Sequence, residues 1–254
     1  MIPWEIDGLD EVLGGIRRYS LVLLHEVDPR SRGKELIYHI IKRKLEEDNL
    51  VGYFNISYPL NVVFRTMRRV GIDVDGALAE RRLAMVDTFG SFYGIKYNVE
   101  SVWYLEGSLS SETLAAKYAR VIEAHKKVWA ERGMFEGREL FGFAVDMTTY
   151  IDLFNSEEET LRYLEVSADI RAVHSAYRKY PRGTNFWVWS GMKSPKVFAS
   201  VYRRADYVLR TRSYLAEDGV KRELIVLKTP EMGSRLIRFE YTFTKDGVEA
   251  WRVD

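Results

Sequence analysis

Short apolar runs alternate along this chain with longer segments whose apolar residues recur at helical spacing. Strand-like runs occur at 20–25, 50–57, 82–89, 140–147 and 184–191, and helical periodicity marks 35–48, 60–70, 112–132 and 157–180. A continuous apolar run of this length is typical of a strand buried on both faces. Alternating strands and helices therefore predict an α/β fold: a mostly parallel central sheet in three layers, with helices on both faces.

The end of the chain follows a different pattern. Strand-like segments at 207–214, 221–229, 236–244 and 248–253 are separated by turn-forming residues at 216–219 and 245–247. Such spacing predicts antiparallel hairpins added to the parallel sheet. Because no linker, repeat or low-complexity segment divides the sequence, we expect residues 1–254 to form a single domain, long enough to bury a large core.

Composition excludes several classes of protein. Apolar residues make up 46% of the chain and charged residues 30%, which is typical of a soluble globular protein. The absence of cysteine excludes disulfides, thiolate catalysis and Cys-ligated zinc, and the absence of glutamine resembles a heat-adapted protein. The apolar runs are too short to cross a bilayer and the N-terminus is acidic, so we expect a cytoplasmic protein without membrane contact.

One loop has the outline of a phosphate-binding loop. The stretch HEVDPRSRGKEL, residues 25–36, lies between a predicted strand and a predicted helix. The nucleotide-binding pattern in this position is G-x-x-x-x-G-K-[ST]. Aligned on Gly33 and Lys34, the chain has Asp28 in place of the first glycine and Glu35 in place of the hydroxyl residue.

Further segments share this family outline. IDGLDEVLGGI at 6–16, followed by RRYSLVLLH, resembles the GLDxxLGGGI element that precedes the phosphate loop in the KaiC branch of the RecA-like ATPases. Lys228-Thr229-Pro230 followed by Gly233-Ser234 resembles the KMRGS segment of that family. The resemblance implies a RecA-like fold and descent from an ATP-binding, often hexameric protein.

The departures from the family pattern argue against ATP chemistry. A carboxylate at Asp28, about 4 Å from a phosphate oxygen, costs on the order of 4 kcal/mol at an effective dielectric constant near 20. Pro29 removes a backbone N–H donor, and Glu35 replaces the Mg²⁺-ligating hydroxyl. The family's water-activating glutamates fall in the stretch 55–58, which contains no carboxylate, and its KMRG arginine falls at Pro230.

We therefore interpret the loop as a vestigial nucleotide site in a pseudo-ATPase that serves protein binding, assembly or regulation. Its candidate residues occupy phosphate-loop positions and the acidic position ending the fourth strand: Asp28, Arg30, Ser31, Arg32, Gly33, Lys34, Glu35 and Asp146. No catalytic residue, metal ligand or cofactor is expected, although weak binding of ATP with Mg²⁺ or of a small anion stays open. Without a phosphate, Lys34 should form an ion pair with Asp146, Glu35 or Asp28. The alternative is a divergent ATPase that uses Glu35, or a residue of a partner, to hold Mg²⁺.

Charge is distributed unevenly although the net charge is only +1. Residues 171–212 contain ten Lys or Arg and one acid, whereas residues 131–169 contain ten acids and three basic residues. Solvated faces are the simplest explanation, and complementary surfaces of a homo-oligomer or of a protein partner are a second. Nucleic-acid binding through 171–212 is the third. The four histidines have no metal-ligand spacing.

Overall fold

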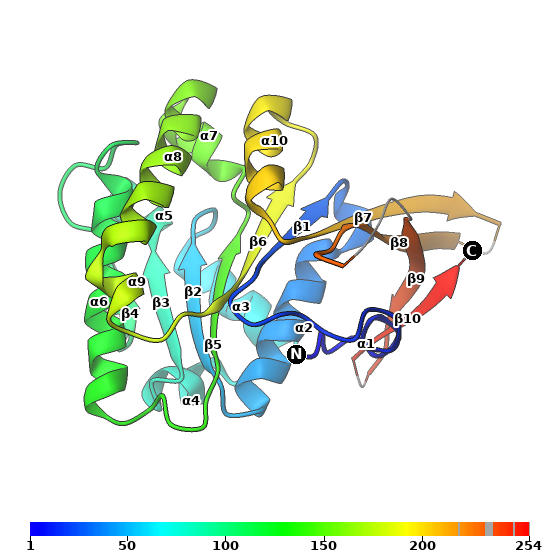
Figure 1. The fold of residues 1–254 in the computed structure, drawn as a ribbon, viewed down its shortest axis with the longest axis horizontal. Coiled ribbons are helices and arrows are strands. Elements are labelled where there is room, and N and C mark those ends of the chain that lie inside the picture. Colours follow the sequence, from blue (N-terminus) through cyan, green and yellow to red (C-terminus); the bar gives the residue numbers. More distant parts are fainter. Residues whose placement is uncertain (218, 232–235, 246, 254) are drawn as a thin grey trace.

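The computed structural model describes residues 1–217, 219–231, 236–245 and 247–253. Its strands form one sheet of 10 strands in the order β10-β9-β8-β7-β1-β6-β5-β2-β3-β4 (Figure 1). The strands are β1 (Leu21–Glu26), β2 (Leu50–Asn55), β3 (Leu83–Asp87), β4 (Val102–Trp103), β5 (Leu140–Val145), β6 (Thr184–Ser190), β7 (Tyr207–Ala216), β8 (Gly219–Lys228), β9 (Ile237–Phe243) and β10 (Val248–Val253).

The parallel part of the sheet consists, in spatial order, of β7, β1, β6, β5, β2, β3 and β4. Strand β1 thus lies between β6 and β7. All residues of β1 after Leu21 are buried, as expected for a strand covered on both faces. Since parallel strands end at the same edge of a sheet, the residues that follow β1, β2, β5 and β6 gather at one edge. That edge carries the phosphate-loop position.

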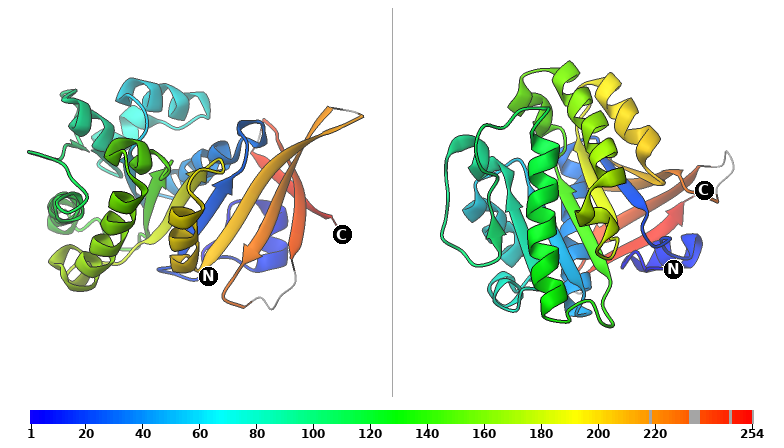
Figure 2. Two further views of the ribbon diagram at one scale, coloured as in Figure 1. Left: turned by 90° about the horizontal axis from the view of Figure 1, so that it is seen from above. Right: turned by 60° about the vertical axis from the view of Figure 1, so that its left-hand side comes forward.

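Helices cover both faces of the sheet (Figure 2). The helices are α1 (Asp7–Leu13), the 3-10 turn η1 (Pro29–Ser31), α2 (Gly33–Glu46), α3 (Leu60–Arg69), α4 (Val74–Ala79), α5 (Thr88–Tyr93), α6 (Leu114–Glu131), α7 (Thr149–Phe154), α8 (Glu157–Val173), α9 (Ser175–Arg178) and α10 (Pro195–Arg204). One core joins α2, α3 and α4 to the sheet, and a second lies under α6, α7, α8, α9 and α10. The prediction of a three-layer α/β fold is confirmed.

Two features of the helical layer differ from the expectation. The helix expected over 157–180 is divided at His174, whose backbone is extended and whose Nδ1 accepts a hydrogen bond from the N–H of Ala176. This side-chain cap ends α8 and starts α9. The second difference is α10, for which no helix was expected. Ser194 caps α10 and Pro195 occupies its first position, where proline is favoured.

The antiparallel hairpins expected at the end of the chain are confirmed, since β8 pairs with β7 and β9, and β9 pairs with β10. Helix α1 packs closely on β10, because a Cβ on Gly8 would lie 1.9 Å from the carbonyl oxygen of Ala250. Gly233 and Ser234 of the KMRGS-like segment, and Asp246 of the last turn, lie outside the described residues. Within the described ranges, no helix has the length and apolar character needed to cross a membrane.

Candidate functional site

The loop that follows β1 makes its hydrogen bonds within the protein. Asp28 caps the η1 turn, where its Oδ1 accepts a hydrogen bond from the N–H of Ser31 at 3.1 Å. Its two carboxylate oxygens also accept hydrogen bonds from Ser213 of β7, from the hydroxyl at 2.6 Å and from the N–H at 2.8 Å. Burial by itself raises the pKa of Asp28, but these donors lower it below the ordinary value. The carboxylate at the first-glycine position thus ties the loop to β7.

The middle of the loop is held against the C-terminal strands. Ser31 is fully buried, and its hydroxyl lies 3.1 Å from that of Thr211 in β7. The hydroxyl of Tyr241 in β9 donates a hydrogen bond to the carbonyl of Ser31. The guanidinium of Arg32 lies 4.1 Å from the centre of the Phe243 ring, a cation–π contact. Strands β7 and β9 therefore fix the conformation of the loop.

Lys34 is surrounded by carboxylates of its own chain. Its ammonium lies 2.7 Å from Asp146 Oδ2 and 3.9 Å from Glu26 Oε2, and its backbone N–H donates to Glu26 Oε1 at 3.0 Å. Burial opposes the charge on Lys34, but the neighbouring carboxylate of Asp146 raises its pKa above the ordinary value. Of the three partners expected for Lys34, the structure shows Asp146.

Glu26 was not a candidate from the sequence, although it ends the strand before the loop. Its side chain is 6% exposed. Burial raises the pKa of Glu26, whereas the hydrogen bond from the Lys34 N–H and the charge of Lys34 lower it. An acidic residue at the end of the buried strand that precedes the loop was the available sequence signal.

Gly33 is required by packing, because a Cβ at this position would lie 2.4 Å from the hydroxyl of Thr211 and 3.2 Å from Cβ of Glu26. The side chain of Glu35, the residue at the Ser/Thr position, is paired with Arg32 and lies 3.8 Å from Arg69 of α3. Arg30 is exposed, and its carbonyl accepts a hydrogen bond from Arg222 of β8. Of the eight residues chosen from the sequence, four line one cleft, and Lys34 and Asp146 form an ion pair there: Arg32, Lys34, Glu35 and Asp146. Asp28, Arg30 and Ser31 are instead hydrogen-bonded to strands β7, β8 and β9.

A cleft of about 630 Å³ opens beside Lys34 at this edge of the sheet. Its walls include Tyr58, whose hydroxyl lies 3.4 Å from the Lys34 ammonium. Ser57 donates to the carbonyl of Asp146 and lies 2.6 Å from the hydroxyl of Thr149. The 55–58 segment, where the family's glutamates would lie, thus supplies the Tyr58 hydroxyl to the cleft.

Asn55, which ends β2, contacts a second buried acid. Its amide donates to Asp87 Oδ1 at 2.8 Å and to the carbonyl of Tyr58 at 2.7 Å. Asp87 is fully buried at the end of β3 and also caps α5 through the N–H of Gly90. Burial raises the pKa of Asp87, and the donors Gly90 and Asn55 oppose this rise. This pair positions the ends of β2 and β3.

The histidines have structural contacts. His25 Nε2 lies 2.8 Å from the carbonyl of Gly191, His39 Nε2 lies 3.0 Å from the carbonyl of Glu5, and His174 caps α9. His125 is buried beside Trp129. Over the described part of the chain, no group of three or more His, Asp or Glu side chains is arranged to hold a metal ion.

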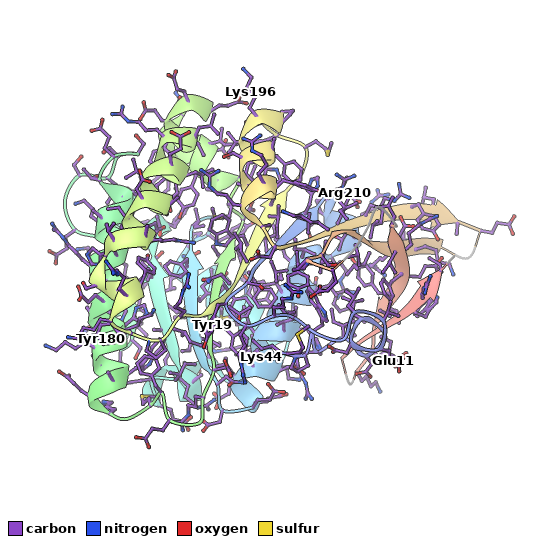
Figure 3. All side chains as sticks on the ribbon, in the orientation of Figure 1. Glu11, Tyr19, Lys44, Tyr180, Lys196 and Arg210 are labelled. Carbon is purple, nitrogen blue, oxygen red and sulfur yellow. The ribbon has the colours of Figure 1, made fainter. Side chains whose placement is uncertain are left out.

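The basic segment 171–212 does not form one continuous face. Figure 3 places Lys196 at the outer tip of α10, beyond the carboxyl ends of the strands, and Tyr180 near the opposite end of the sheet. Arg210 lies on β7, to the right of both in the same view. The positive charges that adjoin in sequence are therefore spread over both ends of the parallel sheet.

Solved structures similar to this chain include two from Pyrococcus horikoshii. Uncharacterized protein PH0321 from Pyrococcus horikoshii, crystallised in complex with an unknown peptide, is 55% identical, covers 100% of both chains and has a TM-score of 0.95. KaiC-like protein PH0186 from the hyperthermophilic archaeon Pyrococcus horikoshii OT3 is 14% identical over 98% of each chain, with a TM-score of 0.70. The second likeness confirms the KaiC-like fold. No protein-family model and no curated protein matches the chain.

Proposed function

This chain belongs to the same protein family as PH0321 of Pyrococcus horikoshii, and from that premise we propose that it is a peptide-binding domain with a KaiC-like fold and a degenerate phosphate loop. In this proposal the domain binds a segment of a protein partner and does not hydrolyse ATP. Its role is assembly or regulation.

The main observation against ATP hydrolysis is that carboxylates of the same chain already bind Lys34. In a working phosphate loop, the lysine ammonium and the N–H groups at the helix start bind the phosphates. Here the ammonium of Lys34 pairs with Asp146, and its N–H donates to Glu26. A triphosphate would have to displace two carboxylates, and each displaced carboxylate would lie beside the incoming negative charge.

The residues that would bind Mg²⁺ and activate the attacking water are also replaced. Arg32 and Arg69 neutralise Glu35, so the side chain at the metal-binding position already has partners. The 55–58 segment offers Asn55, Ser57 and Tyr58, none of which takes a proton from water as a carboxylate does. These substitutions favour a binding role over the alternative of a divergent ATPase.

The peptide in the PH0321 crystal supports the choice of ligand class. That protein is 55% identical to this chain over its full length, with a TM-score of 0.95, so the two share their fold. We extend peptide binding from that protein to this chain.

Isothermal titration with Mg·ATP, combined with a phosphate-release assay and an immobilised peptide array, tests the proposal. We expect no binding heat with Mg·ATP, no phosphate release, and retention of the protein on a subset of peptides. Phosphate release by the native protein that is abolished in Lys34→Ala, together with no retention on the array, would overturn it.

A further inference from the structure

A second cavity lies on the opposite side of the sheet from α2, under α6, α8 and α9. Its volume is about 570 Å³, and it shares no lining residue with the Lys34 cleft. The helices that cover it lie in front of the sheet in the right-hand view of Figure 2. Tyr19, Arg178, Arg182 and Asp206 line the cavity and are exposed, so its mouth lies near the amino ends of β1 and β6.

The floor of this cavity contains a pair of glycines. Gly52 of β2 and Gly142 of β5 are partners in the parallel register and line the cavity together. Glycine inside a strand weakens the strand, and it often marks a close approach by a ligand or another backbone. A Cβ on Gly142 would lie 2.4 Å from Asn185 Oδ1, but a Cβ on Gly52 would meet nothing closer than the Phe141 carbonyl at 3.8 Å. Packing within the protein therefore explains why residue 142 is glycine. It does not explain Gly52, which is consistent with space kept for a bound ligand.

Lys126 and Arg171, two of the four basic residues in the cavity lining, have no carboxylate beside them. Lys126 is 5% exposed, and its ammonium donates to the carbonyls of Ala176 at 3.0 Å and Pro181 at 2.9 Å. Arg171 lies over the ring of Trp187, at 5.1 Å from the ring centre. Among described residues, no carboxylate lies within salt-bridge distance of either cation, and Asp206 at the mouth is the one acid in the lining.

Of these two cations Arg171 is exposed to solvent, whereas the buried Lys126 has no carboxylate as a counter-ion in the described part of the chain. Burial, followed by the charge of Arg171, lowers the pKa of Lys126 to about 8. Beside it, Nδ1 of the buried His125 has no hydrogen-bond partner among the described residues. Burial and the Lys126 charge lower the pKa of His125 to about 3, so its ring is neutral. A bound carboxylate would pair with both cations through charge-assisted hydrogen bonds.

The remaining wall is aromatic. The hydroxyls of Tyr118 and Tyr150 lie 2.6 Å apart, and the hydroxyl of Tyr163 lies 3.5 Å from that of Tyr150. Because these hydroxyls are hydrogen-bonded to one another, the tyrosines offer a ligand mainly the apolar surface of their rings. Trp187 and Phe54 add apolar surface from the sheet.

We propose that this cavity binds the carboxyl-terminal residue of a peptide, with the carboxylate at Lys126 and Arg171 and a large apolar side chain among the tyrosines. The inference rests on the proposed function and names the part of the peptide that is recognised. In a terminal residue the carboxylate and the side chain share one Cα, which matches a cavity that combines cations with aromatic rings. Capture of a chain terminus is an established mode of peptide recognition.

Three probe peptides test the chemistry by isothermal titration: acetyl-Ala-Ala-Ala-Phe with a free carboxyl group, its carboxyl-terminal amide, and the amide of acetyl-Ala-Ala-Glu-Phe. We expect the free acid to bind and the first amide to bind about tenfold more weakly or worse, because a hydrogen-bonded charge is lost. The glutamate peptide distinguishes a side-chain carboxylate from a terminal one and should not recover affinity. Equal binding of free acid and amide, or full recovery with glutamate, overturns the proposal.

Variants then locate the binding. Arg171→Met and Lys126→Met should each weaken binding of the free acid about tenfold or more. Gly52→Ala should also weaken it, because the added methyl group enters the cavity without a clash. Lys127→Met is the matched control, since Lys127 is the exposed neighbour of Lys126 and pairs with Glu131. Binding that none of the three cavity variants alters places the peptide elsewhere, which overturns this inference and leaves the proposed function standing.

Discussion

Replacing Lys34 separates a structural lysine from a nucleotide-binding one. Its ammonium lies 2.7 Å from Asp146 and 3.9 Å from Glu26, and the three side chains are 22%, 11% and 6% exposed. Lys34→Met would leave two nearly buried carboxylates without a cation. Removing one partner of a fully buried ion pair costs about 3–5 kcal/mol, and the partial exposure of Lys34 reduces this to about 2–3 kcal/mol.

Urea unfolding at pH 7 without nucleotide measures this loss as a fall in the free energy of unfolding. Adding Glu26→Gln and Asp146→Asn to Lys34→Met should recover stability to within about 1 kcal/mol of the native protein, since no uncompensated charge then remains. Lys127→Met, the exposed control, should change stability by less than about 0.5 kcal/mol. A Lys34→Met protein as stable as this control would refute the reasoning. The reasoning would also be refuted if Mg·ATP stabilised the native protein against urea but did not stabilise the Lys34→Met variant.

The remaining predictions concern the loop, the buried lysine and assembly. Asp28→Gly should lower the free energy of unfolding by about 2 kcal/mol in urea titrations, because the hydrogen bonds to Ser213 and Ser31 are lost. Combining Asp28→Gly with Glu35→Thr should raise nucleotide affinity in titrations without producing phosphate release. Folding lowers the pKa of Lys126 from its ordinary 10.5 to about 8, so between these values the unfolded state binds more protons and stability rises with pH. Relative to Lys126→Met, the native protein should gain roughly 3 kcal/mol across that window, and a flat difference would contradict the lowered pKa. In light scattering, the molecular mass should be the same with and without ATP, and a nucleotide-driven increase would contradict the loss of the arginine at position 230.

The parts of the fold that depend on hydrophobic periodicity were predictable from the sequence. The buried strands, the hairpins and the strand–loop–helix position of Lys34 follow from the spacing of apolar residues. The helix break at His174 and the start of α10 at Ser194 depend on single side-chain caps within polar stretches, which periodicity does not reveal. The site divides in the same way: the pairing of Lys34 with Asp146 follows from parallel strand ends, whereas the contact with Glu26 depends on how the loop turns back over β1.

The cavity under α6 and α8 was not predictable by the same reasoning. Gly52 and Gly142 lie 90 positions apart in the sequence, and only the strand order β5-β2 brings them together. Likewise, Lys126 and Arg171 come from different helices and each is an ordinary basic residue in its own segment. The cavity combines a glycine with two basic residues that are far apart in the chain, so no short sequence motif marks it.

The contacts between the loop after β1 and the C-terminal strands have a consequence for local unfolding. Asp28, Ser31 and Arg32 are joined to Ser213, Tyr241 and Phe243, so the loop after β1 and the C-terminal strands hold one another in place. Separating either from the other breaks the same contacts, which makes the two segments a single cooperative unit. Backbone amides of the loop should therefore exchange with deuterium at the same rate as those of β7 and β9, and shortening the chain before β9 should release the loop as well.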